Sequence, residues 1–561
     1  MGETAVAAGS WERLATLCAV SLLLLVAIAV ASLQIAGWPF ITLAFLRGQD
    51  VSAFAFVIVG LITMRRLVRS PAIAHRLASA MPRHERFPVS AVAAFVCLVS
   101  FAGVWLVFAD YPLSMDEFWA RADGLIFARG VPLARIPDEW APYARMLQPL
   151  ILHVLPDARL WSSDYLPVNA LLQLALGPFA GPLLAATSVM LVASIARTLM
   201  PNDRGAPLVA ALLLGSSSQL LLTAMTPYSM SAHLAFNLAW LWLFLRHGFT
   251  AQIAAGGVGF LAMGLHQLSF FPLFALPFLA EAFLCGQRRR SIAHAITIIL
   301  GALLWSNYDG IVTMLMGVTP AAGAARDTGW VLGKLLTKIG GFDLQAVGLM
   351  GANLFRFQLW QNPLALPLAL LAVPKVISRP SPLRACLGGI VLVCFLMLFV
   401  QPFQGHGWGY RYLHGELGSV ALLGTYAWFR LADRTSAACQ AYFLSMLAFA
   451  VLILLPLRAY QAWQWTAPYV AANRALHSAD ADLVVIDAPQ HAYTEDLVRN
   501  SPWLDNEPKR IFGVLLDDKA LAQLCRRYRI VFFTDDDAER YGIVGFRDKP
   551  EVPARHRTCA A

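Results

Sequence analysis

The sequence predicts an α-helical protein that crosses a membrane many times and ends in a small C-terminal α/β domain. Of its 561 residues, 58% are hydrophobic and only 14% are charged, whereas a soluble domain carries about 25% charged residues. Apolar runs of roughly 20 residues, the length that a bilayer core requires, recur along most of the chain. Beyond residue 458 they give way to short β-rich segments that alternate with helical ones.

The apolar runs predict about thirteen membrane-spanning helices. The first run follows Glu3, Glu12 and only one nearby basic residue, Arg13, and it is too long for the apolar part of a signal peptide, so we expect it to remain as a span. The expected spans are 14–36, 51–69, 88–109, 178–198, 206–224, 230–247, 250–266, 269–286, 292–312, 360–375, 384–402, 416–431 and 437–457.

The net charge of +9 does not indicate nucleic-acid binding, because the basic residues are spread over the short connections between apolar runs. Runs such as 288–290 always fall on the same side of the expected membrane, which is the positive-inside pattern. The N-terminus is therefore expected in the cytoplasm and the C-terminal domain outside. Arg-rich, Lys-poor usage indicates a bacterial inner membrane, with its lipids as neighbours.

Two long segments, 110–165 and 313–358, are expected on the outer side as helices at the membrane surface. In the first, Ser114 and Glu117 form a capping box, and Pro137 suits the first turn of a second helix. The second segment carries apolar residues around Trp330 at helical spacing.

The C-terminal part, 459–561, is expected to be an α/β domain with parallel strands. It contains no GxGxxG or P-loop pattern, so no nucleotide site is expected there. The expected strands are Leu483–Ile486, Ile511–Leu515 and Ile530–Phe533, and the expected helices are 491–500 and 518–528.

Six of the eight cysteines lie in or next to expected spans, where they are typical small apolar residues. Cys525 and Cys559 lie outside, in a compartment that permits disulfides, so we expect these two to pair.

Several polar residues gather at the outer ends of the spans, among them Asp116, Glu117 and His266. A carboxylate in the first turn of a helix is also stabilised by the helix dipole, and Glu117 completes the capping box and faces Arg121 one turn later. Both carboxylates therefore have a structural explanation beside a catalytic one.

The stretch 405–415 is rich in glycine, which lets the backbone turn tightly and approach a ligand. Arg411 offers a planar charged fork suited to phosphate, on a substrate or on a lipid headgroup. Tyr410 and Tyr412 suit the headgroup level of a membrane. His406 and His414 are substrate-binding candidates, although a loop histidine is more often a surface or hydrogen-bonding residue.

A span followed by Tyr111-Pro-Leu-Ser-Met-Asp116-Glu117, a long outer loop, a late Gly409-Tyr-Arg-Tyr-Leu413 and a final α/β domain resembles the GT-C class of membrane glycosyltransferases, which includes the ArnT and protein O-mannosyltransferase types. The resemblance implies transfer of a sugar from a polyprenyl-phosphate carrier to a glycan or lipid acceptor on the outer face. It implies that Asp116 is the general base and that Arg411 holds the carrier phosphate.

The chain departs from that pattern in two respects. Two spans precede the one that ends near Asp116, so 1–87 reads as an N-terminal addition to a core at 88–458. No second acidic motif of the metal-binding kind is evident; Asp157 and Asp164 are the nearest carboxylates, which leaves a divalent cation open.

Two other function classes stay open. A lipid or glycan transporter or flippase would favour charges at the bilayer midplane and two related halves, and the sequence shows neither clearly. A non-catalytic assembly protein would use its outer domain to bind a partner. Only the enzyme needs the Asp116 carboxylate for chemistry.

Overall fold

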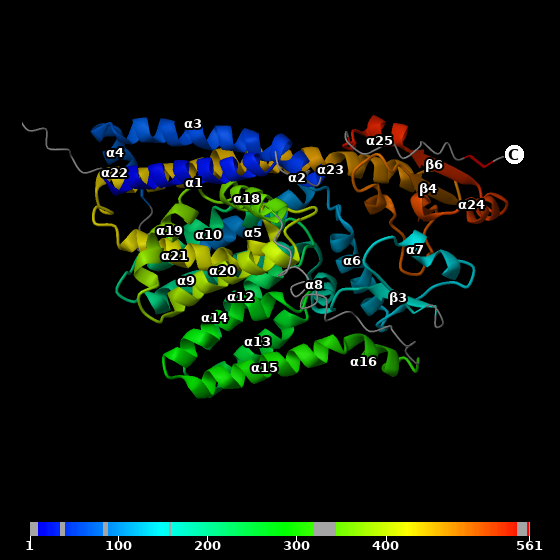
Figure 1. The fold of residues 1–561 in the computed structure, drawn as a ribbon, viewed down its shortest axis with the longest axis horizontal. Coiled ribbons are helices and arrows are strands. Elements are labelled where there is room, and N and C mark those ends of the chain that lie inside the picture. The colour runs from blue at the N-terminus through cyan, green and yellow to red at the C-terminus, as the bar shows by residue number, and fades with distance from the viewer. Residues whose placement is uncertain are drawn as a thin grey trace, which may run out of the picture.

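The computed structural model describes residues 9–33, 40–81, 88–155, 159–318, 344–546 and 558–559. Long helices form a bundle, and α6, a small antiparallel sheet and the C-terminal strands gather at one end of it (Figure 1). The helix α4, which lies in an Arg-rich connection, is at the opposite end (Figure 1). The expected membrane-spanning helical body with a small C-terminal α/β part is therefore present.

The N-terminal helices are packed into this bundle. Helix α1 lies along α18, and α3 and α4 pack against α22 (Figure 1). The bounds of this part are α1 Ser10–Leu33, α2 Phe40–Phe45, the π-helical turn η1 Leu46–Asp50, α3 Val51–Val68 and α4 Pro71–Ser79.

The central helices follow in three groups along the chain. The first is α5 Val89–Leu106, α8 Val168–Leu176, α9 Ala180–Leu199, α10 Ala206–Gly215, α11 Ser218–Thr223 and α12 Met230–Phe244. The second is α13 Phe249–Met263, α14 Phe270–Leu284, α15 Arg288–Ser306 and α16 Tyr308–Leu315. The third is α18 Leu344–Leu359, α19 Ala365–Val376, α20 Pro382–Val400, the turn η5 Arg411–Glu416, α21 Leu417–Phe429, α22 Ala437–Phe449 and α23 Leu455–His477.

Within the described residues, six helices are long and apolar enough to cross a membrane, or seven if the bent pair α15–α16 is one span. Several expected spans are instead shorter apolar helices of 10–17 residues. The six are Ser10–Leu33, Ile41–Val68, Val89–Leu106, Val168–Leu199, Pro382–Val400 and Ala437–His477.

Three expected spans differ for identifiable reasons. The run 206–224 breaks because the Ser216 hydroxyl donates to the Leu212 carbonyl and Ser217 caps the next helix. The run 292–312 bends by 50° between α15 and α16. The last span does not stop at 457 but continues to His477, where it enters the C-terminal domain.

In the segment 110–165, which the sequence places on the outer side, the structure confirms the capped helix, α6 Met115–Ala128. The second helix expected from Pro137 is wrong: that part holds only the turn η2 Ala141–Tyr143 and α7 Ala144–Leu147. A three-stranded antiparallel sheet was missed; its order is β1-β3-β2, with β1 Ala134–Arg135, β2 Leu152–Leu155 and β3 Leu160–Ser163.

The cause is burial against protein. Trp140 and Leu147 pack in one apolar cluster with Leu483 and Ile511 of the C-terminal domain. These apolar residues are therefore buried against protein and do not form the apolar face of a helix at a membrane surface. In the second outer segment, Trp330 and its neighbours in 319–343 lie outside the described residues, and 344–358 belongs to α18.

The C-terminal domain confirms the parallel strands. Its sheet has the order β5-β4-β6, with both pairings parallel, and the central strand is fully buried from Leu483 to Ile486. The elements are β4 Leu483–Asp487, the turn η7 Thr494–Leu497, β5 Lys509–Phe512, the turn η8 Gly513–Leu515, α24 Asp518–Cys525, β6 Ile530–Thr534 and α25 Asp535–Tyr541.

The helix expected at 491–500 is reduced to η7 because the chain after it is held elsewhere: the Asn500 amide donates to the carbonyls of Leu147 and Arg510. The Sγ atoms of Cys525 and Cys559 are bonded in the structure, and their Cα atoms are 5.5 Å apart.

Candidate active site

An ion pair between Asp116 and Arg411 joins α6 to the loop before α21. Asp116 lies in the first turn of α6, and Arg411 begins η5. The Asp116 Oδ2 atom lies 2.8 Å from Arg411 Nη1, although the two residues are 295 positions apart in the sequence. The fold therefore brings together two residues that the family resemblance assigns to one reaction, Asp116 as the general base and Arg411 as the residue that holds the carrier phosphate.

Aromatic side chains surround the pair. The Tyr165 hydroxyl donates to Asp116 Oδ1, and the ring of Tyr165 stacks on His266 with their centroids 3.9 Å apart. On the other side, Arg411 Nη2 donates to the Tyr412 hydroxyl at 3.4 Å. His266 and Tyr412 thus stand beside the pair, and their role in substrate binding stays a prediction.

Asp116 and Arg411 are only partly enclosed. Their side chains keep 16% and 17% of their accessible surface. A cavity of 20 Å³ next to Arg411 and Tyr412 has room for about one water molecule.

The environment keeps the Asp116 carboxyl ionised. Burial raises its pKa, but the charge of Arg411 and the hydrogen bonds from Arg411 and Tyr165 act in the opposite direction, and the net pKa lies below the usual value. Loss of the Arg411 contact would remove the strongest of the lowering effects, and the carboxylate would become more basic.

Glu117 has a different position. Its Oε2 accepts from the Ser114 backbone N–H at 3.0 Å, which completes the capping box, and the Ser114 hydroxyl donates to Tyr228 at 2.9 Å. Burial raises the pKa of Glu117 to about 8. The expected pairing of Glu117 with Arg121 is wrong, because Arg121 binds Asp110.

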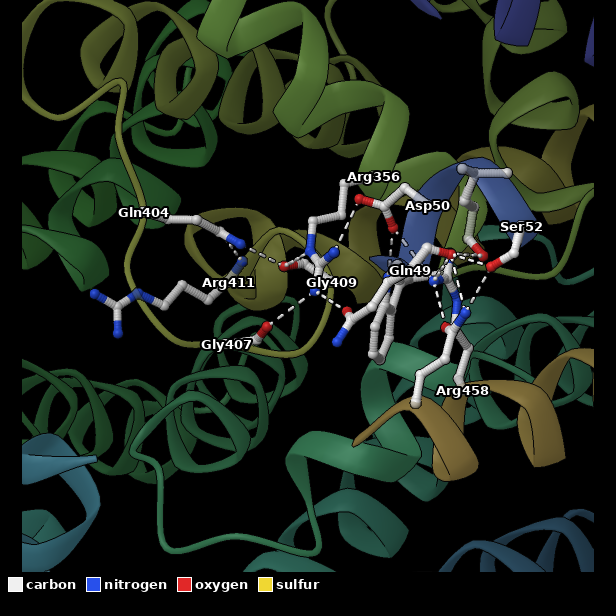
Figure 2. Close-up of polar contacts among 12 residues, drawn as sticks. Gln49, Asp50, Ser52, Arg356, Gln404, Gly407, Gly409, Arg411 and Arg458 are labelled. Carbon is white, nitrogen blue, oxygen red and sulfur yellow. Dashed lines mark hydrogen bonds and ion pairs between the residues drawn. The ribbon is translucent and has the colours of Figure 1, made fainter. Parts of the chain in front are cut away.

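The loop that carries Arg411 is held by hydrogen bonds to the side chain of Gln404 (Figure 2). Gln404 Oε1 accepts from the Arg411 backbone N–H at 3.0 Å, and Gln404 Nε2 donates to the Gly409 carbonyl at 2.8 Å. Gly409 has a φ of +74°, and a Cβ there would collide with the Gln219 side chain. Only glycine suits this position, which explains part of the glycine-rich pattern.

The other candidates in this stretch, His406, Tyr410 and His414, do not bind the ion pair. His406 Nε2 lies 3.1 Å from Asp496, and its Nδ1 accepts from Trp465 at 3.2 Å. Tyr410 and His414 are fully buried. Among the described residues, none of the three makes a hydrogen bond or ion pair with Asp116 or Arg411, so their proposed contact with substrate gains no support from the geometry.

Two residues near the pair were not singled out from the sequence. Tyr165 reaches Asp116 from the segment before α8, and Asp496 Oδ1 accepts from the Met115 backbone N–H at 3.0 Å. Asp496 belongs to the C-terminal domain, which therefore touches the start of α6 one residue from Asp116. Neither residue stands in a recognisable motif, so the sequence carried no signal for them.

No metal-binding group is evident in the part of the chain that the structure describes: it holds no cluster of three or more His, Cys, Asp or Glu side chains that could bind an ion. Asp157 lies outside that part, and Asp164 lies 3.9 Å from His153.

No protein-family model matches the chain, and no curated protein sequence matches it. Several solved structures are similar to it, among them two of ArnT from Cupriavidus metallidurans. The apo structure has a TM-score of 0.47 at 11% identity, over 78% of this chain and 90% of that one. The structure bound to undecaprenyl phosphate has a TM-score of 0.45 at 11% identity, over 75% and 85%. Likeness at this level assigns no activity to the chain.

Proposed function

We propose that this protein is an inverting glycosyltransferase that moves a sugar from a polyprenyl-phosphate carrier to a glycan or lipid acceptor at the outer face of the bacterial inner membrane. The observation that carries the proposal is the partly exposed pair of Asp116 and Arg411, 2.8 Å apart at the junction of the helical bundle and the outer part. A base and a phosphate-binding cation are the two groups that such a transfer needs.

The two residues have separate roles. Asp116 takes the proton from the acceptor hydroxyl while the oxygen of that hydroxyl forms a bond to the anomeric carbon. The bond from that carbon to the phosphate oxygen breaks at the same time, and the electron pair leaves with the carrier phosphate. Arg411 stabilises the charge that develops there, and Tyr165 keeps the carboxylate in a fixed orientation through its hydrogen bond.

The ion pair also links donor binding to base strength. A donor phosphate that binds Arg411 competes with Asp116 for the guanidinium. Asp116 then loses the charge that keeps its pKa low, and its proton affinity rises when the donor is in place. The free protein keeps the carboxylate paired and weakly basic.

Binding of undecaprenyl phosphate, the lipid held by one of the similar solved structures, tests the phosphate role. Native mass spectrometry of the purified full-length protein would compare wild type with Arg411→Gln. The variant should bind roughly 10–100-fold more weakly, because it loses a charge-assisted contact.

Arg430→Gln is the matched control, since Arg430 also pairs with an aspartate, Asp203, at 3.0 Å. It should bind like wild type. Equal binding by Arg411→Gln and wild type would contradict the assignment of Arg411.

A further inference from the structure

A buried cluster of three charged side chains lies beside the loop that carries Arg411 (Figure 2). It consists of Asp50, Arg356 and Arg458, and we call it the buried charge cluster. Asp50 Oδ2 lies 2.9 Å from Arg356 Nη1, and Asp50 Oδ1 lies 3.2 Å from Arg458 Nη1. The three residues come from the N-terminal part, α18 and α23, so the cluster joins distant parts of the chain.

The cluster is unusual in its burial and its charge. The three side chains expose only 0–4% of their surface, and two positive charges share one negative charge. The indole of Trp360 lies against both guanidinium groups, with centroid distances of 5.0 and 4.6 Å. Buried, incompletely neutralised charge is costly and is usually retained for a functional reason.

Hydrogen bonds connect the cluster to the loop. Arg356 Nε donates to the Gly409 carbonyl at 3.2 Å, and Arg356 Nη2 donates to the Gly407 carbonyl at 3.3 Å. The Gly409 carbonyl also accepts from Gln404, whose own oxygen accepts from the Arg411 backbone N–H. An unbroken series of contacts thus runs from Asp50 to Arg411, and from Arg411 to Asp116 (Figure 2 shows the part up to Arg411).

Asp50 is placed by the π-helical turn η1 that precedes α3. In this turn the Gln49 carbonyl is free to accept from Arg458 at 3.2 Å and from Gln461 at 3.0 Å. The Gln49 side chain accepts from Arg356 Nη2 at 2.9 Å. The N-terminal part therefore supplies the only carboxylate that pairs with Arg356 and Arg458 in the described part of the chain.

We infer that Asp50 is a positioning residue: through Arg356 it holds the loop 404–411 so that Arg411 faces Asp116. The N-terminal spans, which read as an addition in the sequence, are by this inference part of the site. The effect of Asp50 on phosphate binding rests on the proposed function. The effect of Asp50 on the position of the loop 404–411 does not, and it is tested without any ligand.

Hydrogen exchange of the full-length protein measures the loop directly. Asp50→Asn keeps the shape of the side chain and removes its charge. Amide exchange in 404–411 should become about tenfold faster, with other helical peptides unchanged. Glu281→Gln is the control, because Glu281 forms a partly buried ion pair with Arg384 at 2.6 Å on α14 and α20; it should leave 404–411 unchanged. Unchanged exchange in the loop of Asp50→Asn, or an equal increase everywhere, would overturn the inference.

A double-mutant cycle separates positioning from general stability. Asp50→Asn should weaken undecaprenyl phosphate binding about tenfold in the wild-type background and should add no further loss to Arg411→Gln. The same loss in both backgrounds would show that Asp50 does not act through Arg411. If wild type binds no undecaprenyl phosphate, the proposed function fails, and the exchange experiment alone decides the role of Asp50.

A second variant covers the case in which Asp50→Asn does not fold. Asp50→Asn combined with Arg458→Gln returns the buried charge cluster to its original net charge while it still removes the carboxylate charge that pairs with Arg356. The same faster exchange confined to 404–411 is expected, and exchange like that of wild type would overturn the inference.

Discussion

Neighbouring carboxyl groups at the start of α6 have opposite environments. Asp116 faces Arg411 and Tyr165, which hold its pKa below the usual value, whereas burial raises the pKa of Glu117 to about 8. One group is thus ionised and reaches other elements, and the other is largely protonated inside a helix cap at neutral pH. Such divergence is how proteins give different roles to like side chains.

Glu117 predicts a pH dependence of stability. Its pKa in the folded protein, about 8, lies above the ordinary 4.5. Its contribution to stability is therefore complete below pH 4.5 and is lost as the pH rises through 8. Glu117→Gln stays neutral and should flatten the decline of the melting temperature between pH 5 and pH 8.5. If the melting temperatures of wild type and Glu117→Gln fall equally between pH 5 and pH 8.5, this prediction is contradicted.

The sequence was informative where a short stretch carried the signal. The Ser114–Glu117 cap follows from spacing alone, and Asp116 and Arg411 each stand in a stretch that carries the family resemblance, although the contact between them spans 295 positions. Tyr165 could not be found, because its contact with Asp116 spans 49 residues and depends on how β3 leads into α8. His406 and His414 were named for their residue type. The fold turns His406 toward Trp465 and Asp496, and it buries His414 with no hydrogen-bond partner for its ring nitrogens among the described residues.

Among the elements, α6 is the one that positions Asp116, the candidate general base. Its periodicity and cap were sufficient to predict it. The helix expected after Pro137 failed because Trp140 and Leu147 are buried against the C-terminal domain, and the run 206–224 broke where serine hydroxyls bind the backbone. Residue propensity and apolar spacing predict an element as if it were isolated. The two wrong predictions arise from contacts with another domain in one case and from hydrogen bonds between serine side chains and the backbone in the other.

The N-cap of α6 allows the effect of a lost cap on stability to be distinguished from its effect on activity. Ser114→Ala should cost about 1 kcal/mol, since it removes the N-cap hydrogen bond, and it should also reduce activity because α6 carries Asp116. Ser436→Ala removes the corresponding cap of α22, where Ser436 accepts from Cys439 N at 3.2 Å. It should destabilise similarly in thermal unfolding and leave activity unchanged. Equal activity of the two variants would contradict the role of α6.

At the scale of the whole molecule, the site lies where three parts of the chain meet. The N-terminal spans contribute Asp50, the helical bundle contributes Arg356 and Arg411, and the C-terminal domain contributes Asp496 next to α6. Hydropathy predicted the membrane class and the α/β domain, because both depend on composition and pattern. It could not predict that the N-terminal part is joined to the site, since buried ion pairs between distant helices leave no periodic signal.

The most direct test of the central claim is a comparison of glycans in cells. A strain lacking the gene would be complemented with wild type, Asp116→Asn or the control Asp203→Asn, and mass spectrometry would measure surface glycans and the pool of polyprenyl-phosphate sugars. Asparagine keeps the size of the side chain and cannot act as a base. If Asp116 is the general base, one glycan substituent disappears in the deletion and in Asp116→Asn, at equal protein levels, while Asp203→Asn retains it. Full complementation by Asp116→Asn, with a phenotype in the deletion, would contradict the account and favour a transporter or an assembly protein.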